Sequence, residues 1–322
     1  MEVMSGTFRQ TLNMLATRHR PGAEPNVFLH SLPRSGSTWL MELILTQPGF
    51  RACNEPLNLR KPADQEHLGV SDWADLHRPS SKAKLHDYFE GLCSDRLRDP
   101  RLGFPSPLSK FYRPITRRIV FKVIHAAEEH INWLAETFNG KVLFLLRHPI
   151  PVSLSRKVFP KLDTILSTEF AQFFTESQLA LAQRIIRGDN KLARGVLDWC
   201  LRNSVALRSR TNEWTIVSYE QLVVNPTPAI DRISKNLGLP NPEWILKRLP
   251  VPSQSTRQSN PDTQEKLHAN RDRNDQSWLV EKWRTEVTDG DLSMADEIMA
   301  AFDLGGVYRM TGALPERRYW ID

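Results

Sequence analysis

The chain has 322 residues, 40% of them hydrophobic and 25% charged, which is close to the composition of ordinary globular proteins. This composition excludes a disordered, collagen-like or disulfide-scaffold protein. The three cysteines are odd in number, which argues against a disulfide framework, and their spacing is not that of a zinc site. The formal net charge of +6 favours anionic partners, but the scattered basic residues form no block typical of a nucleic-acid tail or a membrane-surface patch.

The apolar segments and the cysteines of the sequence also predict where in the cell the protein is located. No segment reaches the roughly 18 consecutive apolar residues of a membrane span, and residues 1–25 lack the apolar core of a secretory signal. The odd cysteine count favours a reducing compartment. We therefore expect a cytoplasmic protein with no membrane span and no nucleic-acid partner, in an oligomeric state that the sequence leaves open.

Short apolar runs alternate with longer helical patterns along the chain. The apolar runs predict buried strands at residues 27–30, 119–123, 142–146 and 215–219. Apolar residues three or four apart predict helices at 38–46, 128–138, 164–187 and 191–210. This alternation is typical of an α/β fold, a mostly parallel central sheet flanked by helices on both faces.

The remaining segments predict no second domain. We expect a single domain over residues 1–322, with residues 1–25 as an N-terminal extension. Residues 60–115 and 250–277 are rich in Pro, Arg and Asp with weak periodicity, so we expect both to be long excursions from the sheet.

A polar loop follows the first predicted strand. It reads Leu32-Pro33-Arg34-Ser35-Gly36-Ser37-Thr38, and an amphipathic helix begins near Trp39. A helix N-terminus has backbone N–H groups without intrahelical partners and a partial positive charge, so this loop predicts an anion site. Arg34 adds a fixed charge, Gly36 permits close approach of the backbone, and we expect Ser37 or Thr38 to cap the helix.

The kinase phosphate loop, G-x-x-x-x-G-K-[ST], is not present. Gly140-Lys141 lacks the upstream glycine and precedes a strand instead of following one, which disfavours an ATP kinase.

A second basic motif follows the third predicted strand. Arg147-His148-Pro149 comes directly after Leu146, and Pro149 suits a first helical turn. Ligands of open parallel sheets bind beyond the carboxyl ends of the strands, so Arg147 is expected at the same edge as Arg34.

Together these motifs resemble the PAPS-dependent sulfotransferases, where PAPS is 3′-phosphoadenosine-5′-phosphosulfate. The segment from Pro33 to Trp39 resembles the 5′-phosphosulfate loop of that family, and Arg147 with Ser155 resembles its 3′-phosphate motif. The resemblance implies a P-loop-NTPase-like sulfotransferase fold, with PAPS as donor and no metal. It implies that the donor is bound by Arg34, Ser35, Gly36, Ser37, Thr38, Trp39, Arg147 and Ser155.

The resemblance continues towards the C-terminus. Ser218-Tyr219-Glu220-Gln221-Leu222 is similar to a family segment whose Tyr reaches the adenine, so Tyr219 is assigned that role. Lys282-Trp283-Arg284 resembles a basic segment that closes over the nucleotide, which makes Arg284, and less directly Arg273, candidates for donor binding. Residues 60–115 and 155–195 match no family motif, and we expect them to be insertions that build the acceptor site.

Two residues are candidate catalytic bases. Glu55 follows Arg34 by 21 residues and resembles the catalytic Glu of carbohydrate- and protein-tyrosine-modifying members. His125 lies three residues after Lys122 and resembles the catalytic His of members that act on small phenols and alcohols. Glu55 is the preferred base, while Arg34, with Lys122 as a possible addition, faces the charge that grows on the departing phosphate.

These residues predict a PAPS-dependent sulfotransferase acting on an unidentified small-molecule, carbohydrate or peptide acceptor through a hydroxyl or amine. The alternatives are a nucleotide or sugar kinase and a nucleotide-binding protein without catalysis. A metal site at His125 and His130 is disfavoured, because their spacing of five turns them away from a shared helix face.

Overall fold

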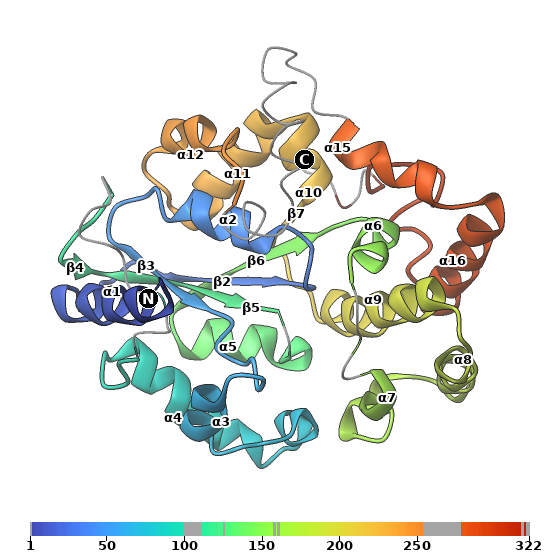
Figure 1. Ribbon diagram of the computed structural model, residues 1–322, viewed down its shortest axis with the longest axis horizontal. Coiled ribbons are helices and arrows are strands. Elements are labelled where there is room, and N and C mark those ends of the chain that lie inside the picture. Colours follow the sequence, from blue (N-terminus) through green and yellow to red (C-terminus); the bar gives the residue numbers. More distant parts are fainter. Residues whose placement is uncertain are drawn as a thin grey trace.

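A five-stranded, entirely parallel sheet forms the centre of the described part of the molecule (Figure 1). The computed structural model describes residues 2–99, 103, 111–124, 126–156, 159, 162–253, 278–316 and 319. The strand order is β3 (Phe50–Asn54), β5 (Arg118–Val123), β2 (Asn26–Ser31), β6 (Gly140–Leu146) and β7 (Thr215–Ser218). The predicted α/β class is confirmed, and all four predicted strands are present.

Helices cover both faces of this sheet, and each face has its own apolar core. One core packs Phe28, Phe121 and Phe144 against helices that include α4 (Ser81–Cys93), α5 (Ile131–Thr137) and α9 (Lys191–Arg208). The other core packs Val27 and Leu143 against α2 (Ser37–Ile44), α10 (Tyr219–Val224) and α11 (Pro226–Leu237). Alternate residues of each strand point to opposite faces, so the continuous apolar runs reflect burial on both sides.

The edge strand β3 was not predicted from the sequence. Its residues Phe-Arg-Ala-Cys-Asn interrupt the apolar pattern with Arg51, which is 1% exposed. The guanidinium donates to the carbonyl of Leu92 at 2.6 Å, and this bond offsets part of the cost of burying the charge. A search for apolar runs does not detect a strand that contains a buried, hydrogen-bonded arginine.

The long helix predicted at 164–187 is wrong. That region forms α7 (Leu162–Ile165), a 3₁₀ helix η4 (Glu169–Phe173) and α8 (Glu176–Arg187). Thr175 and Gln178 form a capping box, in which side chain and backbone bond reciprocally, and this box starts α8. The helix at 191–210 is confirmed as α9, and the helix at 128–138 consists of η3 (Glu128–His130) followed by α5.

Residues 60–93 are more regular than expected. They form α3 (Pro62–Leu68), the 3₁₀ helix η1 (Trp73–His77) and α4, and buried Leu85, Phe89 and Leu92 of α4 pack into the core. Residues 254–277 of the second expected excursion lie outside the described residues. The assignment of a single domain and of acceptor-site insertions stays a prediction.

Helices complete both ends of the chain. The C-terminal part contributes α12 (Pro242–Arg248), α15 (Trp278–Glu281), the 3₁₀ helix η5 (Lys282–Glu286) and α16 (Asp289–Ala301). At the N-terminus, α1 (Glu2–Ala16) leads into β1 (Arg18–His19), which pairs with β4 (Ile115–Thr116) in a small parallel ladder. Among the described helices, none combines the length and apolar content required to cross a membrane.

Candidate active site

The loop between β2 and α2 has the strand, loop and helix geometry that the sequence predicts. Arg34 and Gly36 have φ angles of +72° and +92°, and Gly36 is the N-cap of α2. No side chain caps this helix, so the predicted capping role of Ser37 or Thr38 is wrong. The N-terminal amides of α2 are therefore not occupied by a side-chain cap and are oriented to bind an anion.

Gly36 is required by its surroundings as well as by its φ angle. A Cβ atom at this position would lie 2.8 Å from Cδ2 of Tyr219, closer than nonbonded carbon atoms pack. Tyr219 is the first residue of α10, directly after β7, and its ring lies edge-on to Trp39 at 5.9 Å between centroids. The loop, Trp39 and Tyr219 thus form one packed unit.

Arg147 joins the two predicted anion motifs. Its Nη1 donates to the carbonyl oxygen of Arg34 at 2.7 Å, and its guanidinium lies 4.2 Å from the centre of the Tyr219 ring. The indole Nε1 of Trp199 donates to the carbonyl of Arg147 at 2.9 Å. The structure therefore places Arg147 beside the loop between β2 and α2, at the same edge of the sheet.

A buried cluster supports the turn that carries Arg147. Glu220 accepts from the backbone N–H of His148 at 2.9 Å and from the hydroxyl of Tyr308 at 2.9 Å. The ring of Trp283 stacks on His148 at 4.5 Å. Burial lowers the pKa of His148 to about 3, so its imidazole is neutral, and burial raises the pKa of Glu220.

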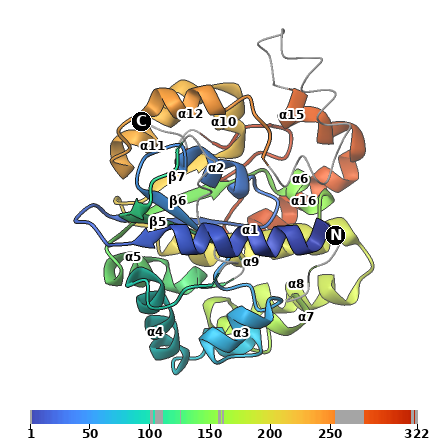
Figure 2. The ribbon, with the colours of Figure 1, turned by 60° about the vertical axis from the view of Figure 1, so that its left-hand side comes forward.

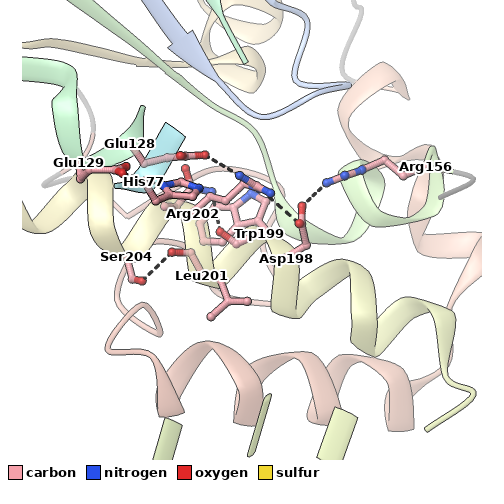
Figure 3. A network of polar contacts seen from close by, with 10 residues as sticks. His77, Glu128, Glu129, Arg156, Asp198, Trp199, Leu201, Arg202 and Ser204 are labelled. Atoms are coloured by element: carbon pink, nitrogen blue, oxygen red, sulfur yellow. Dashed lines mark hydrogen bonds and ion pairs between the residues drawn. The ribbon is translucent and has the colours of Figure 1, made fainter. Parts of the chain in front are cut away.

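An ion-pair network continues this support between α9 and the residues that follow α6 (Pro149–Leu154) (Figure 3). Arg156 and Arg202 both pair with Asp198, and Arg202 also contacts Glu128 at 2.8 Å. Although burial alone would raise it, the two guanidinium groups hold the pKa of Asp198 below its usual value. Because Arg156 follows Ser155, the network anchors the segment that carries the second motif.

Glu55, Lys122 and Thr38 form a chain of contacts between neighbouring strands. Asn54 of β3 is in register with Lys122 of β5, and the next residue, Glu55, turns with φ +57°. Lys122 Nζ lies 2.9 Å from Glu55 Oε1 and donates to Thr38 Oγ1 at 2.9 Å, while Asn58 donates to Glu55 Oε2 at 2.9 Å. Burial lowers the pKa of Lys122, and the Glu55 carboxylate opposes that effect.

These groups line one cavity of about 570 Å³. From the first loop, the cavity is lined by the predicted residues Arg34, Gly36, Ser37, Thr38 and Trp39. Elsewhere it is lined by the predicted residues Glu55, Arg147, Ser155 and Tyr219. A volume of this size accommodates a nucleotide-sized ligand.

Two predicted residues have other positions. Ser35 is 1% exposed, does not line the cavity, and donates its backbone N–H to the carbonyl of Leu32 at 3.3 Å. Arg284 is exposed, with its guanidinium 5.2 Å from the Trp283 ring centre, whereas Lys282 and Trp283 line the cavity. The candidate base His125 and the weaker candidate Arg273 lie outside the described residues.

Sequence reasoning missed Asn58 and Arg60, which line the cavity beside Glu55. Asn58 is recognisable only in the structure, because its role depends on the turn that returns its amide to the carboxylate three residues earlier. Among the residues that the structure describes, no group of three or more His, Cys, Asp or Glu side chains is arranged to hold a metal ion.

Comparison with solved structures gives matches of low identity. Mouse sulfotransferase SULT7A1 complexed with PAP is 17% identical, with a TM-score of 0.46 over 92% of this chain and 91% of that chain. The sulfotransferase domain of the Synechococcus PCC 7002 olefin synthase is 17% identical, with a TM-score of 0.44 over 87% and 95%. A sulfotransferase domain from the curacin biosynthetic pathway is also 17% identical, with a TM-score of 0.42 over 89% and 99%.

Among curated proteins, no significant match to the chain is found. The model of the Sulfotransferase family matches residues 25–243, which is more than half of the chain. The matched segment contains the Arg34 loop, Glu55, Lys122, Arg147 and Tyr219, the residues that meet at the cavity. The chain therefore belongs to the sulfotransferase family.

Proposed function

We propose that this sulfotransferase uses PAPS as its donor and transfers the sulfuryl group to a hydroxyl or amine of an acceptor. The product nucleotide is then 3′-phosphoadenosine 5′-phosphate (PAP). The observation that carries the proposal is the position of Lys122, whose Nζ lies 2.9 Å from both Thr38 Oγ1, at the anion loop, and Glu55 Oε1. This one cation connects the donor side of the cavity with the candidate base.

The residues around the anion loop support the donor assignment. The N-terminal amides of α2 and the Arg34 side chain suit the 5′-phosphosulfate, and Arg147 with Ser155 suits the 3′-phosphate. Trp39 and Tyr219 line the same cavity and supply aromatic surface for the adenine. We propose Lys282, in place of Arg284, as the cation of η5 that contacts the nucleotide, because Lys282 lines the cavity.

Glu55 is the proposed base. The hydrogen bonds from Lys122 and Asn58 fix its carboxylate in the cavity, in position to accept the proton of the acceptor. As the acceptor oxygen bonds to sulfur, the bond between sulfur and the 5′-phosphate oxygen breaks and negative charge moves onto that phosphate. This charge is faced by Lys122, Arg34 and the α2 amides. Preorganised donors accelerate a reaction most when they lie where charge develops in the transition state.

Because the chain belongs to the sulfotransferase family, sulfuryl transfer is favoured over the kinase and the non-catalytic alternatives. We propose a small molecule, a carbohydrate or a peptide as the acceptor.

We also propose a cytoplasmic location. All three cysteines are free thiols, and Cys53 and Cys200 are buried, which suits a reducing compartment.

The proposed function is tested with Glu55→Gln and a matched control, Glu66→Gln, which makes the same change at an exposed position on α3. The transfer of ³⁵S from labelled PAPS is measured with a panel of a phenol, a primary alcohol, an oligosaccharide and a tyrosine peptide. Loss of a general base lowers kcat about 10²–10⁴-fold. We expect that loss for Glu55→Gln only, with PAP affinity by calorimetry almost unchanged in both variants.

Two results contradict the proposal. Equal kcat in the unchanged protein and in Glu55→Gln removes Glu55 as the base. Failure of the unchanged protein to bind PAP or to transfer the label from PAPS to any member of the panel removes the donor assignment.

A further inference from the structure

An apolar stripe runs along the outside of α1. Phe8, Leu12 and Leu15 are 67%, 47% and 60% exposed, although each is large and hydrophobic. Their spacing of four and three residues places them on one face of the helix. In Figure 2, α1 crosses the front of the molecule and no other element lies in front of it.

The helix is attached at its C-terminal end, so this exposure is not the result of a detached terminus. Arg98 donates to the carbonyl of Met14 and to that of Thr17 at 2.8 Å, and the hydroxyl of Tyr112 donates to that of Ala16 at 2.6 Å. Met14 packs against the main core. One side of α1 thus faces the protein, and the stripe faces outwards.

Basic side chains continue the stripe beyond the end of the helix. In the β1–β4 ladder, His19 and Thr116 point inwards, where they are buried and hydrogen-bonded at 3.0 Å. Their neighbours Arg18 and Ile115, which are in register, point outwards and are exposed.

Strand alternation adds further arginines to this outer side. Arg20 and Arg117 each follow a member of the inward-pointing pair His19 and Thr116, so they point outwards and are exposed. Arg113 is exposed as well. The exposed acid of the segment, Glu24, interacts electrostatically with the buried Arg118. The fold therefore collects positive charge from residues 18–20 and 113–117, which lie far apart in the sequence.

We propose that this basic–apolar face, made of Phe8, Leu12, Leu15, Ile115 and Arg18, Arg20, Arg113, Arg117, docks on a membrane surface that carries anionic lipid headgroups. The helix lies in the plane of the interface, its stripe enters the boundary between headgroups and acyl chains, and the arginines contact phosphate and carboxylate groups. An apolar helix face beside a cluster of basic residues is the combination that interfacial binding needs.

The charge distribution favours a lipid surface over a second copy of the chain. A two-fold dimer brings the same patch of both copies together, and four arginines would then face the same four arginines. A bilayer needs no complementary groove for the protruding Phe8, Leu12 and Leu15 side chains, and its anionic headgroups match the positive charge. The proposal is independent of the reaction at the cavity.

The test is co-sedimentation of the full chain with vesicles of phosphatidylcholine alone and of phosphatidylcholine with about one-third phosphatidylserine. We expect binding to the mixed vesicles only, and weaker binding as added salt shortens the screening length below about 10 Å. Arg18→Gln/Arg117→Gln should weaken binding about thirtyfold, and Phe8→Gln/Leu15→Gln about tenfold or more.

Two controls carry the same chemical changes elsewhere. Arg184→Gln/Arg187→Gln removes two exposed arginines from α8, which lies across the molecule from α1 in Figure 1. Val224→Gln removes an apolar side chain of α10 that is 46% exposed. Both controls should bind vesicles as the unchanged protein does, and PAP affinity should be the same in every variant.

Three results overturn the proposal. The first is equal binding to both kinds of vesicle, or binding to neither. The second is undiminished binding by the stripe or arginine variants. The third is a dimer, seen by light scattering, that Phe8→Gln/Leu15→Gln converts to monomer, because that result assigns the face to a second copy of the chain.

Discussion

Lys122 is the residue on which both halves of the proposed reaction depend. It is 2% exposed, and burial lowers its pKa, while the neighbouring Glu55 carboxylate opposes this shift and favours the charged form. The same contact orients the base. A single side chain therefore supplies positive charge near the donor and a fixed position for the carboxylate.

Lys122→Met keeps most of the volume and removes the charge. We expect kcat to fall about 10²–10³-fold, the range for losing one preorganised donor, while PAP affinity changes less. The control is Lys61→Met, because Lys61 donates to the backbone carbonyls of Asn54 and Glu55, at 2.8 and 3.2 Å, and pairs with the Asp64 carboxylate at 3.7 Å. A kcat that falls equally in both variants indicates that loop structure, and not the Lys122 charge, controls turnover.

Most residues of the two predicted anion motifs do line the cavity, since a loop and a strand end are local features that a sequence reveals. Arg34 and Arg147 each follow a buried strand, and parallel strands bring such ends to one edge. Asn58 and Lys282 depend on how distant or returning segments pack against the cavity, which no local pattern records. The choice between Glu55 and His125 depends on an acceptor that neither motif describes.

At the scale of elements, a buried hydrogen bond between Tyr308 and Glu220 helps to join the C-terminal segment to the second motif. Tyr308 and Glu220 lie far apart in the sequence, and the carboxylate also binds the backbone N–H of His148 at the start of α6. Since both Glu220 oxygens have donors, removing one leaves a buried polar atom unsatisfied. The bond ties the end of the chain to the turn that positions Arg147.

Tyr308→Phe should lower the free energy of unfolding by about 1–3 kcal/mol, the cost of a buried acceptor without its partner. Urea unfolding measures that loss, and calorimetry should show weaker PAP binding if the turn moves. Tyr112→Phe is the control, because its hydroxyl donates to an exposed carbonyl and water can replace it. Equal losses in the two variants would contradict the role assigned to burial.

The elements that sequence patterns misplace have physical explanations. The edge strand β3 contains the buried Arg51, and this charged residue interrupts the apolar run by which a strand is recognised in a sequence. The predicted helix at 164–187 is interrupted by the capping box at Thr175, a start signal that outweighs the apolar periodicity. The strands β2, β5 and β6 were predictable because burial on both faces requires continuous apolar runs.

For the whole molecule, buried histidines link stability to pH. Burial lowers the pKa of His30 to about 4 and that of His148 to about 3, from a usual value of 6.5. Between pH 6.5 and about 4, the unfolded chain therefore binds protons that the folded chain does not. Stability is lost as the pH falls through this window, and it is fully present above it.

We expect the free energy of unfolding to fall by roughly 3–4 kcal/mol between pH 7 and pH 5 from these two groups alone. Urea unfolding at both pH values measures the difference. His148→Gln and His30→Gln should each remove about half of it. If both variants lose as much stability as the unchanged protein, other groups are responsible for the acid sensitivity.

The strand order β3-β5-β2-β6-β7 also constrains how the chain assembles during synthesis. The central strand β2 is made before both of its neighbours, β5 and β6, which lie roughly a hundred residues later. Until the ribosome has produced those strands, β2 has no partner in the sheet, and its apolar side chains have no second layer to cover them. Such distant pairings slow folding and leave a nascent chain open to aggregation, so we expect β2 to be the strand of this sheet that waits longest unpaired during synthesis.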